Sequence, residues 1–341
     1  MNQLYLGIDI GTSSTKSIVI DGIGRVLGFG RSVYDNLNPR IGWVEQNPDT
    51  WCRAVVDSVQ EAVGQLKGSR RIAGIGMTGQ MHGLVMLDTE LKPLAPAILW
   101  PDVRAADEVQ DIKRQYGQKL FEMTGGPIAT GFLLASLLWV KGNRPDIYSR
   151  IHAVLTPKDY IRLQLTGKVA TDPSDACGTG AFLPAASQWA VDLIDGLGLD
   201  PKFFPEVMPS CSVAGMLLPY AADQLGLEDG IPVVTGCGDL HASAMGIGIT
   251  HPRQLLVNVG TGGQVFQLLN HYAFDPYGRL HTMVHADGRS WHAMGAILAA
   301  GLSMSWIGSI IGADPATGLS FLFASSSGII ACDEDLYFLP Y

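Results

Sequence analysis

Two similar hairpin patterns occur at distant positions of the chain and set the framework for its fold. Residues 4–20 form a pattern of apolar strand, small-residue turn and second strand, and residues 254–269 repeat this order around Gly-Thr-Gly-Gly. Strand patterns alternate with helical patterns along the rest of the chain, which is typical of an α/β protein. The two hairpin patterns are too far apart in the sequence to be repeats of a solenoid. We therefore predict a duplicated architecture with one small-residue loop in each half.

Helical periodicity is clearest over residues 47–68, where Asn47 is the predicted N-cap, Pro48 the first helical residue and Gly68 the residue after the C-terminal cap. Further helices are predicted at residues 105–116, 135–143, 158–165 and 240–247, with a weaker one at 188–197. Strands are predicted at residues 72–76, 84–87 and 232–235. The apolar run 293–311 is interrupted by glycine and serine and is too short to span a bilayer, so we interpret it as a buried helix.

Composition narrows the class of protein. The chain has 341 residues, 47% of them hydrophobic and 16% charged, which indicates a well-packed core and room for two domains. The formal net charge of −9 disfavours nucleic acid and anionic membrane surfaces as partners. Five cysteines are scattered singly, which suggests reduced thiols, and the N-terminus lacks the basic segment of a signal peptide. We therefore expect a cytoplasmic protein with no nucleic-acid or membrane partner.

The first loop combines a carboxylate with small residues. Asp9 ends the first strand, and Gly11, Thr12 and Ser13 follow. Backbone N–H groups and hydroxyls in such a turn can approach a phosphate chain closely, and Asp9 could hold Mg²⁺ directly or through water. Taken alone, these residues fit an ordinary hairpin turn equally well. The second loop, at residues 260–263, has no carboxylate, but the pair of loops favours a nucleotide held between two halves.

Asp239 follows a buried strand and a glycine-lined turn and precedes a helical pattern. One interpretation is a helix N-cap without further role. The other is a general base, because a carboxylate at the carboxyl end of a strand can accept the proton of an attacking hydroxyl. Phosphoryl transfer requires such a base, together with a cation and in-line positioning of the reactants.

A glycine-flanked segment, residues 79–83, lies between two predicted strands and contains Gln80, Met81 and His82. Gln and His can hydrogen-bond a polyol and Met adds an apolar contact, although a tight turn with a solvated His is the simpler interpretation. The glycine spacing over residues 74–79 matches a dinucleotide-binding fingerprint, but a strand follows it where a helix is required. No P-loop motif occurs in the sequence.

Eight stretches, in order along nearly the whole chain, resemble the FGGY family of carbohydrate kinases and, within it, the kinases of D-xylulose. They are GIDIGTSSTKSIVID, GWVEQNPDTWC, GMTGQMHGLVMLD, PAILWPDVRA, LTPKDYIRLQLTG, TDPSDACGTG, PVVTGCGDLHASAMGIG and VNVGTGG. The resemblance implies an actin-like, ribonuclease H-like, two-domain ATPase fold of the α/β class. Residues 1–234 would form the sugar-binding domain and residues 235–341 the first part of the nucleotide-binding domain.

The resemblance also implies roles for individual residues. Asp239 matches the catalytic base, and Asp9 matches the acidic residue near Mg²⁺ and the transferred phosphoryl group. The implied ketose site comprises Gln80, Met81, His82, Trp100 and Asp239. The implied nucleotide site comprises Gly11, Thr12, Ser13, Gly260, Thr261 and Gly262. The expected reaction converts ATP and D-xylulose into ADP and D-xylulose 5-phosphate, and a homodimer is compatible with this assignment.

Departures from the xylulose-kinase pattern leave alternatives open. Leu240 after the base and Gln264 after the second loop are similar to sedoheptulose-type kinases, so a seven-carbon ketose is an alternative substrate. Family members continue for well over a hundred residues past the point where this sequence stops, at the apolar segment 336–341. We therefore expect a C-terminally truncated chain with an incomplete second domain. A sugar-binding remnant without kinase activity is the alternative function.

Overall fold

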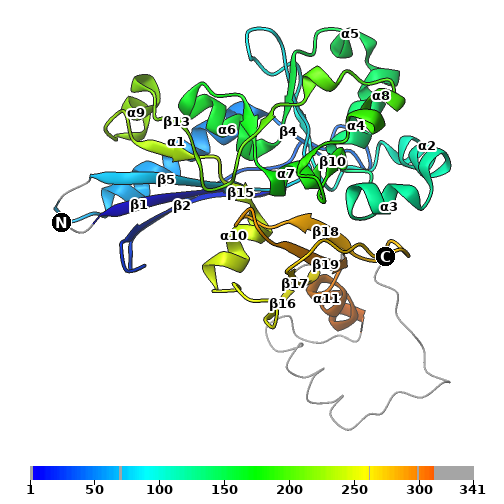
Figure 1. The fold of residues 1–341 in the computed structure, drawn as a ribbon. Coiled ribbons are helices and arrows are strands. Elements are labelled where there is room, and N and C mark those ends of the chain that lie inside the picture. Colours follow the sequence, from blue (N-terminus) through cyan, green and yellow to red (C-terminus); the bar gives the residue numbers. More distant parts are fainter. Residues whose placement is uncertain (1–2, 69–70, 261, 298, 311–341) are drawn as a thin grey trace.

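The computed structural model describes residues 3–68, 71–260, 262–297 and 299–310 (Figure 1). A larger body contains the N-terminal strands, and a smaller body lies below it in the view of Figure 1. Thr261 and the predicted apolar end at residues 336–341 lie outside the described residues. Within the described ranges, no helix is both long and apolar enough to cross a lipid bilayer.

The larger body is built on one mixed sheet with the strand order β13-β14-β5-β1-β2-β3, and β15 also pairs with β5. These strands are β1 (Leu4–Ile10), β2 (Ser14–Asp21), β3 (Val26–Val33), β5 (Ile72–Gly79), β13 (Val213–Met216), β14 (Pro232–Val234) and β15 (Cys237–Gly238). β1 is antiparallel to β2 and parallel to β5, so the first hairpin lies within the sheet. Alternate residues of β1 are buried on one face, which directs Asp9 to the opposite face.

Helices cover the buried face of this sheet. α1 (Pro48–Gly64) packs on β2 and β3, α6 (Pro157–Thr166) packs on β5, and α9 (Pro219–Leu225) contacts both helices (Figure 1). The approach of α1 is close, because a methyl group at position 30 would lie 2.0 Å from the carbonyl oxygen of Ser58. Gly30 therefore permits the helix to lie directly on the sheet.

Short elements complete the larger body and have a core of their own. They are β4 (Glu45–Gln46), β6 (Val85–Leu87), β7 (Ala97–Ile98), α2 (Ala106–Tyr116), α3 (Lys119–Thr124), α4 (Leu133–Asn143), α5 (Pro145–Tyr148), β8 (Ala153–Leu155), β9 (Ala170–Thr171), α7 (Pro173–Gly178), β10 (Phe182–Leu183), β11 (Gln188–Trp189), α8 (Val191–Gly196), a 3₁₀ helix (Pro201–Phe203) and β12 (Glu206–Val207). Leu84, Leu134, Leu137 and Leu193 are among the fully buried residues of this second core.

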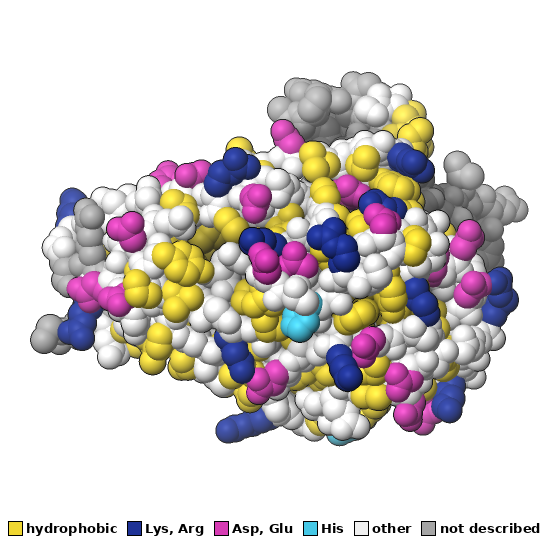
Figure 2. All heavy atoms as spheres, turned by 90° about the horizontal axis from the view of Figure 1, so that it is seen from above, with side chains coloured by type: hydrophobic (Ala, Val, Ile, Leu, Met, Phe, Trp, Pro, Cys, Tyr) yellow, Lys and Arg dark blue, Asp and Glu magenta, His cyan; other side chains and the backbone are white. Residues whose placement is uncertain are grey.

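Acidic and basic side chains are interspersed on the face seen in Figure 2, unlike the basic stripe typical of a nucleic-acid-binding surface.

The smaller body contains an antiparallel sheet with the strand order β16-β17-β19-β18. Its elements are α10 (Asp239–Gly246), β16 (Leu255–Val259), β17 (Gly263–Leu269), β18 (His281–Val284), β19 (Trp291–Ile297) and α11 (Gly301–Ile310). The predicted domain boundary after residue 234 precedes β15, which still pairs with β5 of the first sheet. The division into a sugar-binding and a nucleotide-binding domain stays a prediction.

The helix starting at Pro48 is confirmed, with Asn47 Oδ1 accepting a hydrogen bond from the N–H of Asp49 at 3.0 Å. This helix ends at Gly64, before the predicted Gly68. The weak helix predicted at 188–197 is wrong at its start, where β11 pairs with β10 before α8 begins.

The buried helix predicted at 293–311 is also wrong. Residues up to Ile297 belong to β19, which pairs with β17 and β18, and α11 begins only at Gly301. Within the described part of the chain, α11 buries only Gly308. Pairing with β17 and β18 overrides the local helical pattern here.

Candidate active site

The first loop, between β1 and β2, is held by side chains from three other segments. Tyr34 Oη donates a hydrogen bond to the Gly11 carbonyl at 2.7 Å. Gln46 Nε2 donates to the Thr12 carbonyl at 2.7 Å, and the Trp100 indole N–H donates to Thr12 Oγ1 at 3.0 Å. The loop conformation is therefore fixed in advance by the surrounding protein, which favours binding of an anionic group by its backbone.

Gln46 is a positioning residue that sequence reasoning missed. Its Oε1 accepts hydrogen bonds from Trp51 Nε1 at 2.7 Å and Gln80 Nε2 at 3.2 Å, while its amide nitrogen supports Thr12. Gln80 also lies within 3.4 Å of the Gly11 carbonyl. The predicted sugar-site residues Gln80 and Trp100 thus contact the first loop, and contact of either with a sugar stays a prediction.

Asp9 lies on the open face of the sheet next to this loop. Its Oδ2 is 3.8 Å from Nζ of Lys16, its register partner on β2, whereas its Oδ1 is buried without a hydrogen-bond partner. Burial raises the pKa of Asp9, and the Lys16 charge opposes this rise. An unpartnered carboxylate oxygen is a suitable ligand for Mg²⁺. Among the described residues, no group of three or more His, Cys, Asp or Glu side chains could hold a metal.

Asp239 is the first residue of α10, and Gly238 occupies the N-cap position. Asp239 is exposed, whereas its neighbours Gly238 and Leu240 are buried. Burial raises the pKa of Asp239 to about 6, while the hydrogen bond from the Leu240 N–H to Oδ1, at 2.7 Å, opposes this rise. The charge of Asp9 raises it further, so the two carboxylates lie within electrostatic range of each other.

The Met81–His82 segment lies directly against the turn that carries Asp239. β15 pairs with β5, with Gly238 opposite Gly79, and a methyl group at position 238 would lie 2.5 Å from Met81 Sδ. Glycine at this position therefore allows Met81 to approach the residue preceding Asp239. The structure brings together two motifs that lie about 160 residues apart in sequence.

His82 has an unusual conformation and a fixed ring. Its φ angle is 73°, which only a few per cent of non-glycine residues adopt and which is often found at functional sites. The ring stacks on Phe132 at 4.3 Å, and Nδ1 is 2.6 Å from the Gly178 carbonyl. Because burial lowers the pKa of His82 and a carbonyl can only accept, Nδ1 carries the proton and Nε2 is an acceptor.

A cavity of about 530 Å³ separates the open face of the sheet from α10. Its lining comes from β1, β2, β5, the Ser210–Cys211 segment, the β14–β15 segment and α10, and includes Asp9, Lys16, Thr78, Cys211, Cys237 and Met245. This volume is in the range of small-molecule sites. Asp9 therefore faces a space large enough for part of a nucleotide or sugar.

The second loop lies between β16 and β17. Gly260 N–H donates to the Gly262 carbonyl at 2.9 Å, and the Gly301 N–H donates to the Gly260 carbonyl at 2.9 Å. Thr261 is outside the described residues. In the described part, no hydrogen bond or ion pair joins Gly260 or Gly262 to Asp9 or Asp239. In the first loop, the Ser13 carbonyl accepts a hydrogen bond from the Tyr34 N–H at 3.1 Å. The binding of a nucleotide by both loops stays a prediction.

Comparison with known proteins by sequence and by structure gives carbohydrate kinases in both cases. The model of the FGGY family of carbohydrate kinases, N-terminal domain, matches residues 4–246. A xylulose kinase of Staphylococcus xylosus is 36% identical over 310 residues, which are 91% of this chain and 64% of that protein. The solved structure of xylulose kinase from Rhodospirillum rubrum matches with a TM-score of 0.92 and 27% identity, over 99% of this chain and 70% of that one. A gluconate kinase structure from Lactobacillus acidophilus matches with a TM-score of 0.90 and 25% identity, over 96% and 66%. The chain thus spans about two thirds of the length of these relatives.

Proposed function

Because the chain belongs to the FGGY family of carbohydrate kinases and has the actin-like fold of that family, we propose that it phosphorylates a ketose with ATP. The proposed substrate is D-xylulose and the proposed product is D-xylulose 5-phosphate, since the relatives above include xylulose kinases. The observation that supports this proposal most strongly is the pair of carboxylates, Asp9 and Asp239, which lie within electrostatic range of each other.

In the proposed mechanism, Asp239 acts as the general base. The Leu240 N–H holds Oδ1, which leaves Oδ2 to accept the proton of the attacking ketose hydroxyl as its oxygen bonds to the γ-phosphorus of ATP. His82 Nε2 accepts a hydrogen bond from a second ketose hydroxyl, and Met81 contacts the carbon chain. These contacts orient the sugar, which contributes to the rate by fixing the distance between the reacting atoms.

The phosphate side of the proposed site comprises the first loop and Asp9. The loop backbone and the hydroxyls of Thr12 and Ser13 bind the phosphate chain. Mg²⁺ held by Asp9 would supply positive charge to balance the charge on the phosphates. Lys16 moderates the charge of Asp9, since its ammonium group lies 3.8 Å from the carboxylate.

A substrate screen tests the proposal. ADP formation is measured by a coupled assay with xylulose, ribulose, sedoheptulose, glycerol and gluconate at equal concentrations. The highest kcat/KM is expected with D-xylulose, and a preference for sedoheptulose would change the substrate but keep the enzyme class. If no substrate stimulates ADP formation, calorimetry with ketose and ATP analogue separately distinguishes a sugar-binding remnant from a protein that binds neither.

The pH dependence of kcat/KM should report the ionisation of Asp239. The base works in its deprotonated form and its pKa is raised to about 6 by burial, so activity should be full above that pH and fall about tenfold per unit below it. Asp9 and Lys16 are the charged side chains that influence this group, in opposite directions. Initial rates between pH 4.5 and 8, with coupling enzymes in excess, measure the acidic fall of kcat/KM. A value of kcat/KM that does not fall between pH 6 and pH 4.5 would contradict the assignment of this base.

A further inference from the structure

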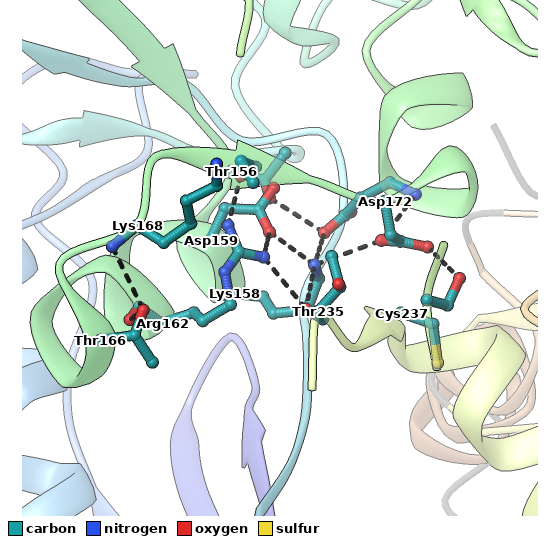
Figure 3. Close-up of polar contacts among 12 residues, drawn as sticks. Thr156, Lys158, Asp159, Arg162, Thr166, Lys168, Asp172, Thr235 and Cys237 are labelled. Atoms are coloured by element: carbon teal, nitrogen blue, oxygen red, sulfur yellow. Dashed lines mark hydrogen bonds and ion pairs between the residues drawn. The ribbon is translucent and has the colours of Figure 1, made fainter. Parts of the chain in front are cut away.

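Beneath the turn that carries Asp239 lies a cluster of charged side chains that the proposed mechanism does not use. Lys158, Asp159 and Arg162 come from α6, and Asp172 is the N-cap of α7 (Figure 3). Asp175 comes from α7, and all five side chains have no exposed surface. Lys158 Nζ lies 2.6 Å from Asp159, 3.2 Å from Asp172 and 3.3 Å from Asp175. Arg162 Nη1 lies 2.7 Å from Asp159.

The two cations converge on one backbone carbonyl. Lys158 Nζ donates a hydrogen bond to the Thr235 carbonyl at 3.3 Å, and Arg162 Nη1 donates to the same oxygen at 3.0 Å. Thr235 follows β14 and begins the turn that leads to Asp239. The cluster therefore fixes the start of this turn.

The anionic side of the cluster reaches the other end of the turn. Ser174 Oγ donates to Asp172 Oδ2 at 2.6 Å and accepts a hydrogen bond from the N–H of Gly238 at 3.1 Å. Ser210 Oγ donates to the same Asp172 oxygen at 2.7 Å. A continuous path of contacts thus runs from Lys158 through Asp172 and Ser174 to the residue immediately before Asp239.

Stability alone does not account for this arrangement. Buried ions lose their hydration, and apolar side chains of similar volume often stabilise a fold equally well or better. Burial also raises the pKa of Asp175 to about 8 against the pull of Lys158, so ionising this carboxyl inside the cluster has a cost in free energy.

Resting on the proposed role of Asp239, we infer that this cluster is a positioning device: Lys158 and Arg162 hold Thr235, and Asp172 acts through Ser174 to hold Gly238. Within the part of the chain that the structure describes, the Asp239 carboxylate accepts a hydrogen bond from the Leu240 N–H, so its direction depends on the backbone of this turn. A shift of about 1 Å in a catalytic group can lower a rate about 100-fold. Ser174 and Asp172 are therefore positioning residues of the proposed reaction.

Ser174→Ala tests this inference without changing any charge, because it removes only the hydrogen bond that Ser174 Oγ donates to Asp172 and the one that it accepts from the Gly238 N–H. We expect kcat with D-xylulose to fall about 10- to 100-fold and KM to change less than threefold. Ser58→Ala is the matched control, since Ser58 is also fully buried and hydrogen-bonded, to Ser17 at 2.8 Å, between α1 and β2. The control should keep the wild-type kcat.

Hydrogen exchange of the segment 235–240 provides a readout that does not require turnover. Exchange should be faster in Ser174→Ala and unchanged in Ser58→Ala, measured by mass spectrometry on the full chain at equal temperature. Unchanged exchange in Ser174→Ala, or unchanged kcat in an active protein, would overturn the inference. If exchange is faster in Ser174→Ala but the wild-type chain has no kinase activity, the result would support the inference that Ser174 holds this turn. It would reject the proposed function instead.

Discussion

Asp239→Asn is expected to lower kcat for ketose phosphorylation by about 10³-fold, within the range that general bases contribute. Asn keeps the size of the side chain and its hydrogen bond from the Leu240 N–H but cannot accept a proton at neutral pH. Since the base acts mainly in the transition state, the Kd of the ketose should stay within about tenfold of the wild-type value. Steady-state kinetics and titration calorimetry measure the two quantities.

The control for this experiment is Asp229→Asn, in an exposed position before β14. It changes the net charge by the same amount and should keep the wild-type kcat. Turnover of Asp239→Asn within about tenfold of wild type would remove Asp239 from the role of base. A loss of ketose binding equal to the loss of kcat would instead identify Asp239 as a binding residue.

Lys158→Met is expected to destabilise the fold by about 3–5 kcal/mol, because it leaves buried carboxylates without their shared cation. Chemical denaturation with urea at pH 7 measures the loss. The loss of stability should depend on pH. In Lys158→Met, the buried carboxylates lack their cation, so their pKa values are higher in the folded state than in the unfolded state. The free energy of unfolding of this variant therefore falls as pH rises. The variant should therefore be closer to wild type at pH 5 than at pH 8.

The matched control is Lys168→Met. Lys168 forms a surface ion pair with Glu206 at 2.7 Å, with side chains 40% and 60% exposed, so its loss should cost less than about 1 kcal/mol. Equal destabilisation by the two substitutions would show that burial of the Lys158 cluster has no special energetic effect. Lys158→Met reports on folding, whereas Ser174→Ala reports on the placement of Asp239.

The local part of the fold was predictable from sequence. Asn47 and Pro48 marked the start of α1, and Asp9 and Asp239 were placed at or just after the ends of strands because small residues punctuate the chain there. The actin-like architecture came from the order of eight motifs, which the family match bears out. These signals depend on neighbours in the sequence, so no tertiary contact was needed to find them.

The supporting residues were not predictable, because their partners are distant in sequence. Gln46 contacts Thr12 across 34 residues, and Lys158 contacts Thr235 across 77. Charged residues in a helical pattern are normally read as a solvated face, yet Lys158 and Arg162 have no exposed surface. β19 was missed for another reason, because its strand conformation depends on pairing with β17 and β18 rather than on its own residue pattern.

A crystal structure of the chain with D-xylulose would show whether Asp239 faces the reacting hydroxyl. We expect the sugar between the Met81–His82 segment and α10, with its 5-hydroxyl oxygen within about 3 Å of an Asp239 carboxylate oxygen, the distance a general base requires. Sugar bound elsewhere, or bound with every hydroxyl out of hydrogen-bonding reach of Asp239, would contradict it.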